Sequence, residues 1–242
     1  MLFAANPWQN ESLSYSWVTK NWLVDGVLIL NILHQEKMTV SIKKLLKDDI
    51  PCVFINKYLG SQQVNAAGID NHDGVTKVIS HLVDLRHKRI GIINGGLMSV
   101  DGFERFEAYK KVLEQFGLKY NEKIVGYGDF NEEGGYEEMK RILYGSFKPT
   151  AMFCANDIMA IGAMRAIKEK GLRVPDDIAV VGFDDIEAAA VVEPPLTTIR
   201  PPLEDIGAKA IEQLIGDIRN NKKTVEEVSL KTKLIVRESS GA

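Results

Sequence analysis

Cysteine is scarce in this sequence, whose 242 residues include only Cys52 and Cys154. The two lie in separate apolar runs and lack the CxxC spacing of a metal site or a redox pair. The four histidines share no ligand spacing with each other or with the cysteines. The sequence therefore predicts two buried free thiols in a reducing cytosol, with neither a metal nor a cofactor.

The sequence also lacks an excess of positive charge and any long apolar run. Its 30 Lys and Arg against 33 Asp and Glu give a net charge of -3, so no basic field is available to hold a polyanion by counterion release. No segment approaches the about 18 apolar residues of a membrane span, and the first residues carry no secretory signal. We predict a cytoplasmic globular protein that contacts neither membrane nor, by itself, DNA.

The common signatures of catalysis are missing as well. The sequence has no GxSxG nucleophile elbow, P-loop, HExxH or GxGxxG motif. The run 91–96, GIINGG, comes closest to a phosphate loop but lacks the Lys-Ser/Thr ending. We therefore predict that the chain is not an enzyme.

What the sequence does contain is a regular alternation of short apolar runs with longer stretches of helical period. This alternation is typical of βαβ units and a parallel sheet, which indicates an α/β fold. Apolar residues at i, i+3, i+4 and i+7 predict that the helix after Asp73 packs on a sheet, with Asp73 as its N-cap. The predicted strands are 2–5, 26–30, 52–55, 90–93, 124–127, 151–154, 178–183 and 234–236, and the predicted helices are 11–22, 40–47, 74–85, 103–116, 133–143, 157–170 and 203–220.

Polar residues stand where several of the predicted strands end. Asn156 and Asp157 follow one strand, Asp184 and Asp185 another, and Asn56 a third. Ligands of open α/β sheets bind outside the carboxyl ends of the strands, and carboxylate and amide groups suit a polyhydroxylated ligand. The alternative is that these residues only cap the helices that follow, and spacing alone leaves both interpretations open.

Three longer segments resemble the core domain of LacI/GalR-type transcription regulators. They are PTAMFCANDIMAIGAM at 149–164, GLRVPDDIAVVGFDD at 171–185 and PPLTTI at 194–199. The pairs DG at 73–74 and HL at 81–82, together with RIGII at 89–93, match the same family. The PPLTTI segment distinguishes this family from periplasmic sugar-binding proteins of the same fold.

The resemblance implies two Rossmann-like lobes of the type I periplasmic-binding-protein-like fold, joined by three crossovers near Asp70, Arg200 and Lys231. Residues 1–70 and 200–230 would form the N-terminal lobe and residues 71–199 and 231–242 the C-terminal lobe, with a ligand cleft between them. The family's helix-turn-helix head would precede Met1. The first strand and helix of the N-terminal lobe would precede it too, which leaves that lobe incomplete.

The same resemblance assigns ligand-binding roles residue by residue. Arg105 falls where the family places the arginine that grips the effector, and Asp184 where an aspartate receives its hydroxyl groups. Solvation on a helix flanked by Glu104 and Glu107 is the alternative for Arg105, and core packing is the alternative for Phe130. The full set of implied ligand contacts is Arg105, Asp184, Asn156, Phe130, Asn56 and Leu203.

The resemblance therefore implies an effector-sensing and dimerisation domain that controls DNA binding by a head outside this chain. Its implied partners are a small effector, which is a sugar, a sugar phosphate or a purine, a second copy of the chain, and operator DNA only through the absent head. A free-standing sugar-binding protein is the alternative. The effector's identity and the choice between repressor and activator are not readable from the sequence.

Overall fold

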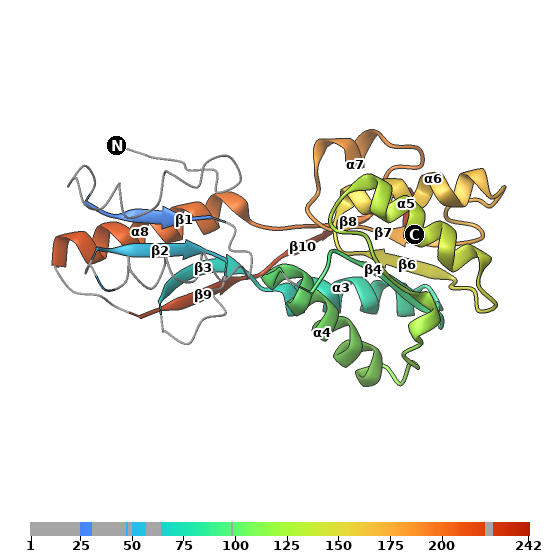
Figure 1. The fold of residues 1–242 in the computed structure, drawn as a ribbon, viewed down its shortest axis with the longest axis horizontal. Helices are drawn as coiled ribbons and strands as arrows, with labels where there is room; N and C mark the ends of the chain where they lie inside the picture. The colour runs from blue at the N-terminus through green and yellow to red at the C-terminus, as the bar shows by residue number, and fades with distance from the viewer. Residues whose placement is uncertain (1–24, 31–46, 48–49, 57–63, 98, 221–224) are drawn as a thin grey trace. The chain divides into compact units, whose positions relative to one another are not determined.

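The computed structural model describes residues 25–30, 47, 50–56, 64–97, 99–220 and 225–242 (Figure 1). The predicted strand 2–5 and helix 11–22 lie outside the described residues, as does the predicted helix 40–47 except for its last residue. Two compact units divide the chain: unit 1 is made of residues 1–69 and 203–230, and unit 2 of residues 70–202 and 231–242.

Within its described residues, unit 1 contains a parallel sheet of four strands in the order β1-β2-β3-β9. Helix α8 packs against β1, β2 and β3 and buries Ile206 and Ala210. Val53 and Phe54 in the middle of β2 are fully buried. The elements are β1 (Val27–Ile29), β2 (Cys52–Ile55), β3 (Asn65–Ile69), α8 (Leu203–Asn220) and β9 (Glu227–Leu230).

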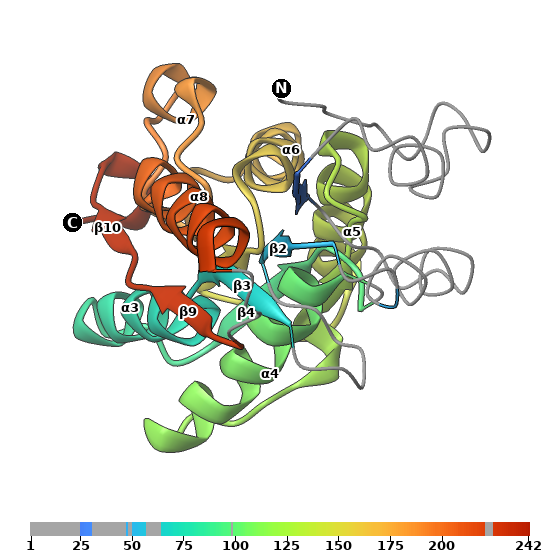
Figure 2. The ribbon, with the colours of Figure 1, turned by 90° about the vertical axis from the view of Figure 1, so that its left-hand side faces the viewer.

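Unit 2 contains a second parallel sheet in the order β5-β4-β6-β7 and an antiparallel pair of strands, β8 and β10. Figures 1 and 2 show α5 and α6 on one face of the parallel sheet and α3 and α4 on the other. The elements are α3 (Asn71–Asp84), β4 (Ile90–Asn94), α4 (Val100–Gln115), η1 (Glu122–Ile124), β5 (Val125–Tyr127), α5 (Glu132–Tyr144), β6 (Ala151–Cys154), α6 (Asp157–Glu169), β7 (Ala179–Val181), α7 (Glu187–Val191), β8 (Thr198–Arg200), β10 (Lys233–Ile235) and η2 (Glu238–Ser240).

The predicted α/β class with parallel sheets is confirmed, and each predicted strand and helix within the described residues corresponds to an observed one. The predicted elements do not include β3, β8, β9 or α7, although a crossover is predicted near Arg200, the last residue of β8. Strand β3 reads NAAGI, which is poor in the β-branched and aromatic residues that favour strands. Strand β9 reads EVSL, and its side chains alternate between exposed and half-buried, so it has no apolar run.

The prediction that Asp73 caps α3 is wrong. The helix begins at Asn71, and its N-cap is Asp70, whose Oδ1 accepts a hydrogen bond from the Asp73 N–H at 2.8 Å. Asp73 lies in the first turn, where its carboxylate accepts hydrogen bonds from Thr232 and Lys77. The carboxylate of Asp73, which the local sequence assigned to capping, therefore makes a long-range contact with Thr232.

Both cysteines are free and buried, as predicted. Burial raises the pKa of the Cys154 thiol far above its ordinary value, so this group stays protonated and unreactive.

Among the helices that the structure describes, none combines the length and the apolar character needed to cross a membrane.

Candidate functional site

Three neighbouring strands of unit 2 end in polar groups at the same edge of the sheet. Strand β4 ends at Asn94, Asn156 follows β6, and Asp184 follows β7. Because β4, β6 and β7 are adjacent and parallel, their carboxyl ends meet. This edge, together with the start of α4, is the candidate ligand-binding surface of unit 2.

Arg105 is buried at this surface and held by several contacts. It is 3% exposed on the second turn of α4, so the solvated-helix interpretation is wrong. Its Nε donates to Asn71 Oδ1 at 2.9 Å, and its Nη1 donates to the Ala155 carbonyl at 2.5 Å. The guanidinium carbon lies 3.7 Å from the centre of the Phe183 ring. Two hydrogen bonds and a stacked ring fix the guanidinium plane, which is the arrangement that directional recognition requires.

Asp184 lies beside this arginine. Its Oδ1 is 3.6 Å from Arg105 Nη1, and 37% of its side chain is exposed. Burial of the carboxyl group raises the pKa of Asp184 to about 6; Arg105 opposes this shift and Asp101 adds to it. The backbone φ of Asp184 is 110°, a conformation that side chains rarely adopt. Strained backbone conformations of this kind are concentrated at active sites and ligand-binding sites.

Two further carboxylates surround the arginine. Asp101 Oδ1 lies 4.0 Å from Arg105 Nη2. The Asn71 amide donates to Asp101 at 3.0 Å and to Glu104 at 2.9 Å. One cation and three carboxylates, including that of Asp184, therefore share this corner of unit 2.

Asn156 and Phe130 lie at the same edge but are engaged with the protein itself. Asn156 Oδ1 caps α6 by accepting from Met159 N at 2.9 Å, and its Nδ2 donates to the Phe130 carbonyl at 3.2 Å. The capping interpretation therefore describes Asn156. The Phe130 ring packs so closely on the backbone that a Cβ at Gly95 would lie 2.1 Å from it, and Phe130 also packs against the hydrophobic core of unit 2.

Asp157, Asp184 and Asp185 do not cap the helices that follow them. The N-cap of α7 is Ile186, which makes no side-chain capping bond. Asp185 instead pairs with Arg200 and Arg237. Asp157 is fully buried and accepts from Thr198 Oγ1 at 2.5 Å and from Ile186 N at 2.9 Å. Burial raises the pKa of Asp157 to about 7 despite these two hydrogen bonds.

The remaining predicted contacts, Asn56 and Leu203, belong to unit 1. Asn56 follows β2 with a φ of 68°, and its backbone N–H donates to the Ala67 carbonyl at 2.9 Å. Leu203 is the first residue of α8 and is 65% exposed. The ligand-binding roles of Asn56 and Leu203 stay predictions.

Sequence reasoning missed Asn71, Asn94 and Asp101. Asn71 follows a strand that was not predicted, so the rule that found Asn56 could not find it. Asn94 directly follows the predicted strand 90–93, so the position of a polar residue after a strand is the signal that could identify it. Both side-chain polar atoms of Asn94 are buried without a hydrogen-bond partner among the described residues. Buried polar atoms without a partner are rare in native proteins.

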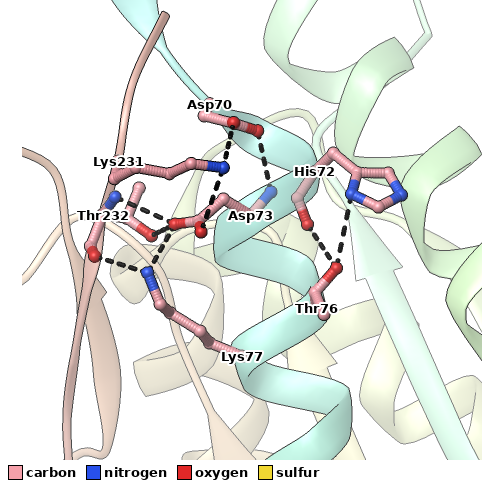
Figure 3. Close-up of polar contacts among 7 residues, drawn as sticks. All are labelled: Asp70, His72, Asp73, Thr76, Lys77, Lys231 and Thr232. Atoms are coloured by element: carbon pink, nitrogen blue, oxygen red, sulfur yellow. Dashed lines mark hydrogen bonds and ion pairs between the residues drawn. The ribbon is translucent and has the colours of Figure 1, made fainter.

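A second polar group, which we call the crossover cluster, joins the start of α3 to the segment between β9 and β10 (Figure 3). Lys231 Nζ lies 2.9 Å from Asp70 and 3.4 Å from Asp73. Asp73 Oδ2 accepts from Thr232 N at 3.0 Å, Thr232 Oγ1 at 2.9 Å and Lys77 Nζ at 2.5 Å. The cluster, made of Asp70, Asp73, Lys77, Lys231 and Thr232, thus ties together two of the points where the chain enters unit 2.

Comparison with known proteins places the chain among regulators of transcription. Residues 79–240 match the model of the periplasmic binding protein-like domain. The HTH-type transcriptional repressor PurR of Haemophilus influenzae is 41% identical over 180 residues, which are 72% of this chain and 54% of that protein. The PurR of Escherichia coli O1:K1 is 32% identical over 241 residues, which are 98% of this chain and 70% of that protein.

Solved structures agree with these relatives. The complex of the transcriptional regulator CelR with cellobiose superposes with a TM-score of 0.86 at 33% identity, covering 93% of this chain and 68% of that one. The chain spans 54% of the length of the Haemophilus relative, so the activity of a whole regulator does not pass to it directly. The relatives are regulators of transcription, not enzymes.

Proposed function

This chain belongs to the LacI/GalR family of transcription regulators, and we propose that it is the effector-sensing and dimerisation domain of such a regulator. Its ligand is a small sugar-like or nucleoside-like molecule that binds between the two units. Binding controls a helix-turn-helix head that reads operator DNA, and the regulator acts in the cytoplasm as a homodimer. The chain itself does not contact operator DNA, which agrees with its net charge of -3.

The observation that carries this proposal is the fixed guanidinium of Arg105 beside Asp184. A planar set of donors next to a carboxylate suits a molecule that presents both acceptors and donors. The relatives are regulators of transcription, which favours binding over catalysis at this pair. The complex of CelR with cellobiose is a precedent for a small ligand in a regulator of this fold.

The proposed mechanism is a shift between conformations. A ligand changes the equilibrium of its protein only by binding one conformation better than another. Contacts from both units to one ligand would favour the conformation in which the units close on it. That change alters the affinity of the attached heads for DNA, and by linkage DNA alters the affinity for the effector equally.

The test is a binding screen by thermal shift against sugars, sugar phosphates and purines, followed by titration calorimetry of each hit. A ligand at a hundredfold excess over its Kd raises stability by about 2.7 kcal/mol. Arg105→Met and Asp184→Asn should each weaken binding at least tenfold, because they remove the fixed donors or the charged acceptor. Asp184 is partly exposed, so its variant keeps the test valid if loss of the buried arginine impairs folding.

Arg165→Met is the matched control. Arg165 pairs with Glu132 and Glu133 on the exposed surface of α5 and α6, so its removal should leave binding unchanged. The proposal is abandoned if no ligand class binds, or if hits bind the Arg105 and Asp184 variants as tightly as the wild type. Sedimentation equilibrium checks the dimer, and a monomer at high concentration would contradict that part.

A further inference from the structure

The charges around Arg105 bear on which class of effector unit 2 can accept. We propose that the part of the effector that meets unit 2 is uncharged and rich in hydroxyl or amino donors, and that phosphorylated or carboxylated effectors are excluded there. This inference rests on the proposed function and narrows it, because sugars, sugar phosphates and purines all remained open.

The first observation is that Arg105 is already neutralised. Its side chain has five N–H donors, of which Nε serves Asn71 and one on Nη1 serves Ala155. The remaining donors face Asp184 at 3.6 Å and Asp101 at 4.0 Å. An anion that approaches the guanidinium also approaches these two carboxylates, and their repulsion opposes it.

The second observation is that the start of α4 already carries a side-chain cap and negative charge. A helix N-terminus normally attracts negative charge through its free N–H groups. Here Ser99 Oγ accepts from Gly102 N at 2.9 Å, and Asp101 supplies a negative charge in the first turn. Glu104 adds a second negative charge one turn further along. The positive end of this helix is therefore matched by groups of the protein itself.

The third observation concerns the other basic side chains near this edge and at the crossovers. Arg200 pairs with Asp185, which it shares with Arg237. Lys231 pairs with Asp70 and Asp73 in the crossover cluster (Figure 3). Each of these cations thus contacts a carboxylate that an incoming phosphate would have to displace, and Asp185 offsets one of the two arginine charges that it meets.

The fourth observation is Asn94, whose side-chain amide is buried without a partner among the described residues. Ile93 packs in the core cluster that α5 and α6 form, so the alternation of a strand places Asn94 on the opposite face, which α3 and α4 cover. Arg105 belongs to α4, so the unpartnered amide and the guanidinium lie on the same side of the sheet. An amide offers a donor and an acceptor but no charge, which again favours an uncharged ligand.

The test measures Kd by titration calorimetry for matched pairs of probes: glucose and glucose 6-phosphate, cellobiose and its 6′-phosphate, and adenosine and adenosine monophosphate. We expect binding from the uncharged member of at least one pair, with its phosphorylated partner at least tenfold weaker. Asp101→Asn combined with Glu104→Gln should reduce that preference at least tenfold, because the repulsion is removed.

Glu107→Gln on the same helix is the matched control, since Glu107 is 48% exposed and pairs with Lys110; it should leave the preference unchanged. Tighter binding of a phosphorylated probe, or a preference that survives the double substitution, overturns the inference and leaves the proposed sensing function standing. If neither member of any pair binds and the broader screen is also empty, the proposed function fails and the inference falls with it.

Discussion

Asp73→Asn is the substitution that tests the crossover cluster most directly. Burial alone would raise the pKa of Asp73, but hydrogen bonds from Lys77 and Thr232 outweigh it and lower the pKa from 3.8 to about 2. At about 1.4 kcal/mol for each pKa unit, this difference corresponds to about 2 kcal/mol of stability at neutral pH. The side chain is only 15% exposed, so solvent screens the interaction little.

The sign of the pH dependence follows from the lowered pKa. The contribution of Asp73 is complete above its unfolded pKa of 3.8 and is lost as the pH falls toward 2. Urea denaturation should therefore show Asp73→Asn less stable than the wild type by about 2 kcal/mol at pH 6, with about 1 kcal/mol of that difference lost by pH 3. In thermal unfolding at neutral pH, the same loss corresponds to a Tm lower by about 4–8 °C.

Asp176→Asn is the matched control. Asp176 is 58% exposed and pairs with Arg173 on the surface of the same unit, so its removal should change stability by less than about 0.5 kcal/mol. The reasoning is refuted if Asp73→Asn is as stable as this control at pH 6. It is also refuted if the difference between Asp73→Asn and the wild type stays constant from pH 6 to pH 3.

Three further outcomes are expected from denaturation measurements. Burial raises the pKa of Asp157 to about 7, so folding takes up a proton and the wild type loses stability as the pH rises from about 4 to 7. The stability of Asp157→Asn relative to the wild type should therefore rise by more than about 1 kcal/mol between pH 5 and pH 8. A stability difference that stays constant over this range would contradict the prediction. Asn94→Leu should leave stability unchanged or raise it, because it removes two unpartnered buried polar atoms, whereas a loss above about 1 kcal/mol would reveal a partner. A Cβ on Gly216 in α8 would meet open space, so Gly216→Ala should stabilise the protein by about 0.5–1 kcal/mol. A Cβ on Gly102 in α4 would lie 2.0 Å from the Gly96 carbonyl oxygen, so Gly102→Ala should destabilise it. The opposite order of stability would contradict this packing.

Local patterns predicted the parts of the fold whose signals lie close together in the chain. The run Ala151–Cys154 is apolar and is followed at once by the capping Asn156, so both β6 and the start of α6 could be read from neighbouring residues. Strand β9 could not, because its place depends on pairing with β3, from Ala66 opposite Glu227 to Ile69 opposite Leu230.

The candidate site shows the same limit. The family resemblance supplied Arg105 and Asp184, but not what holds them. Asn71 is 34 positions from Arg105 and Ala155 is 50 positions away, and no local pattern relates them. The sequence places Glu104 on a solvated helix face and assigns no role to Asp101. Only the fold shows that they contact the Asn71 amide beside the arginine.

The interrupted course of the chain through unit 1 has a consequence for the order in which the protein folds. Asp70 and Lys231 are 161 positions apart, and closing a flexible loop of that length costs on the order of 4–5 kcal/mol in chain entropy. The parallel sheet of unit 2 needs only residues between Ile90 and Val181. We expect it to form first and to shorten the loop that β3 and β9 must close, so that pulsed hydrogen exchange detects protection in β4 and β6 before β3. In a nascent chain, the sheet of unit 1 would then stay incomplete until its last strand, β9, has been synthesised. Simultaneous protection of both sheets would rule this order out.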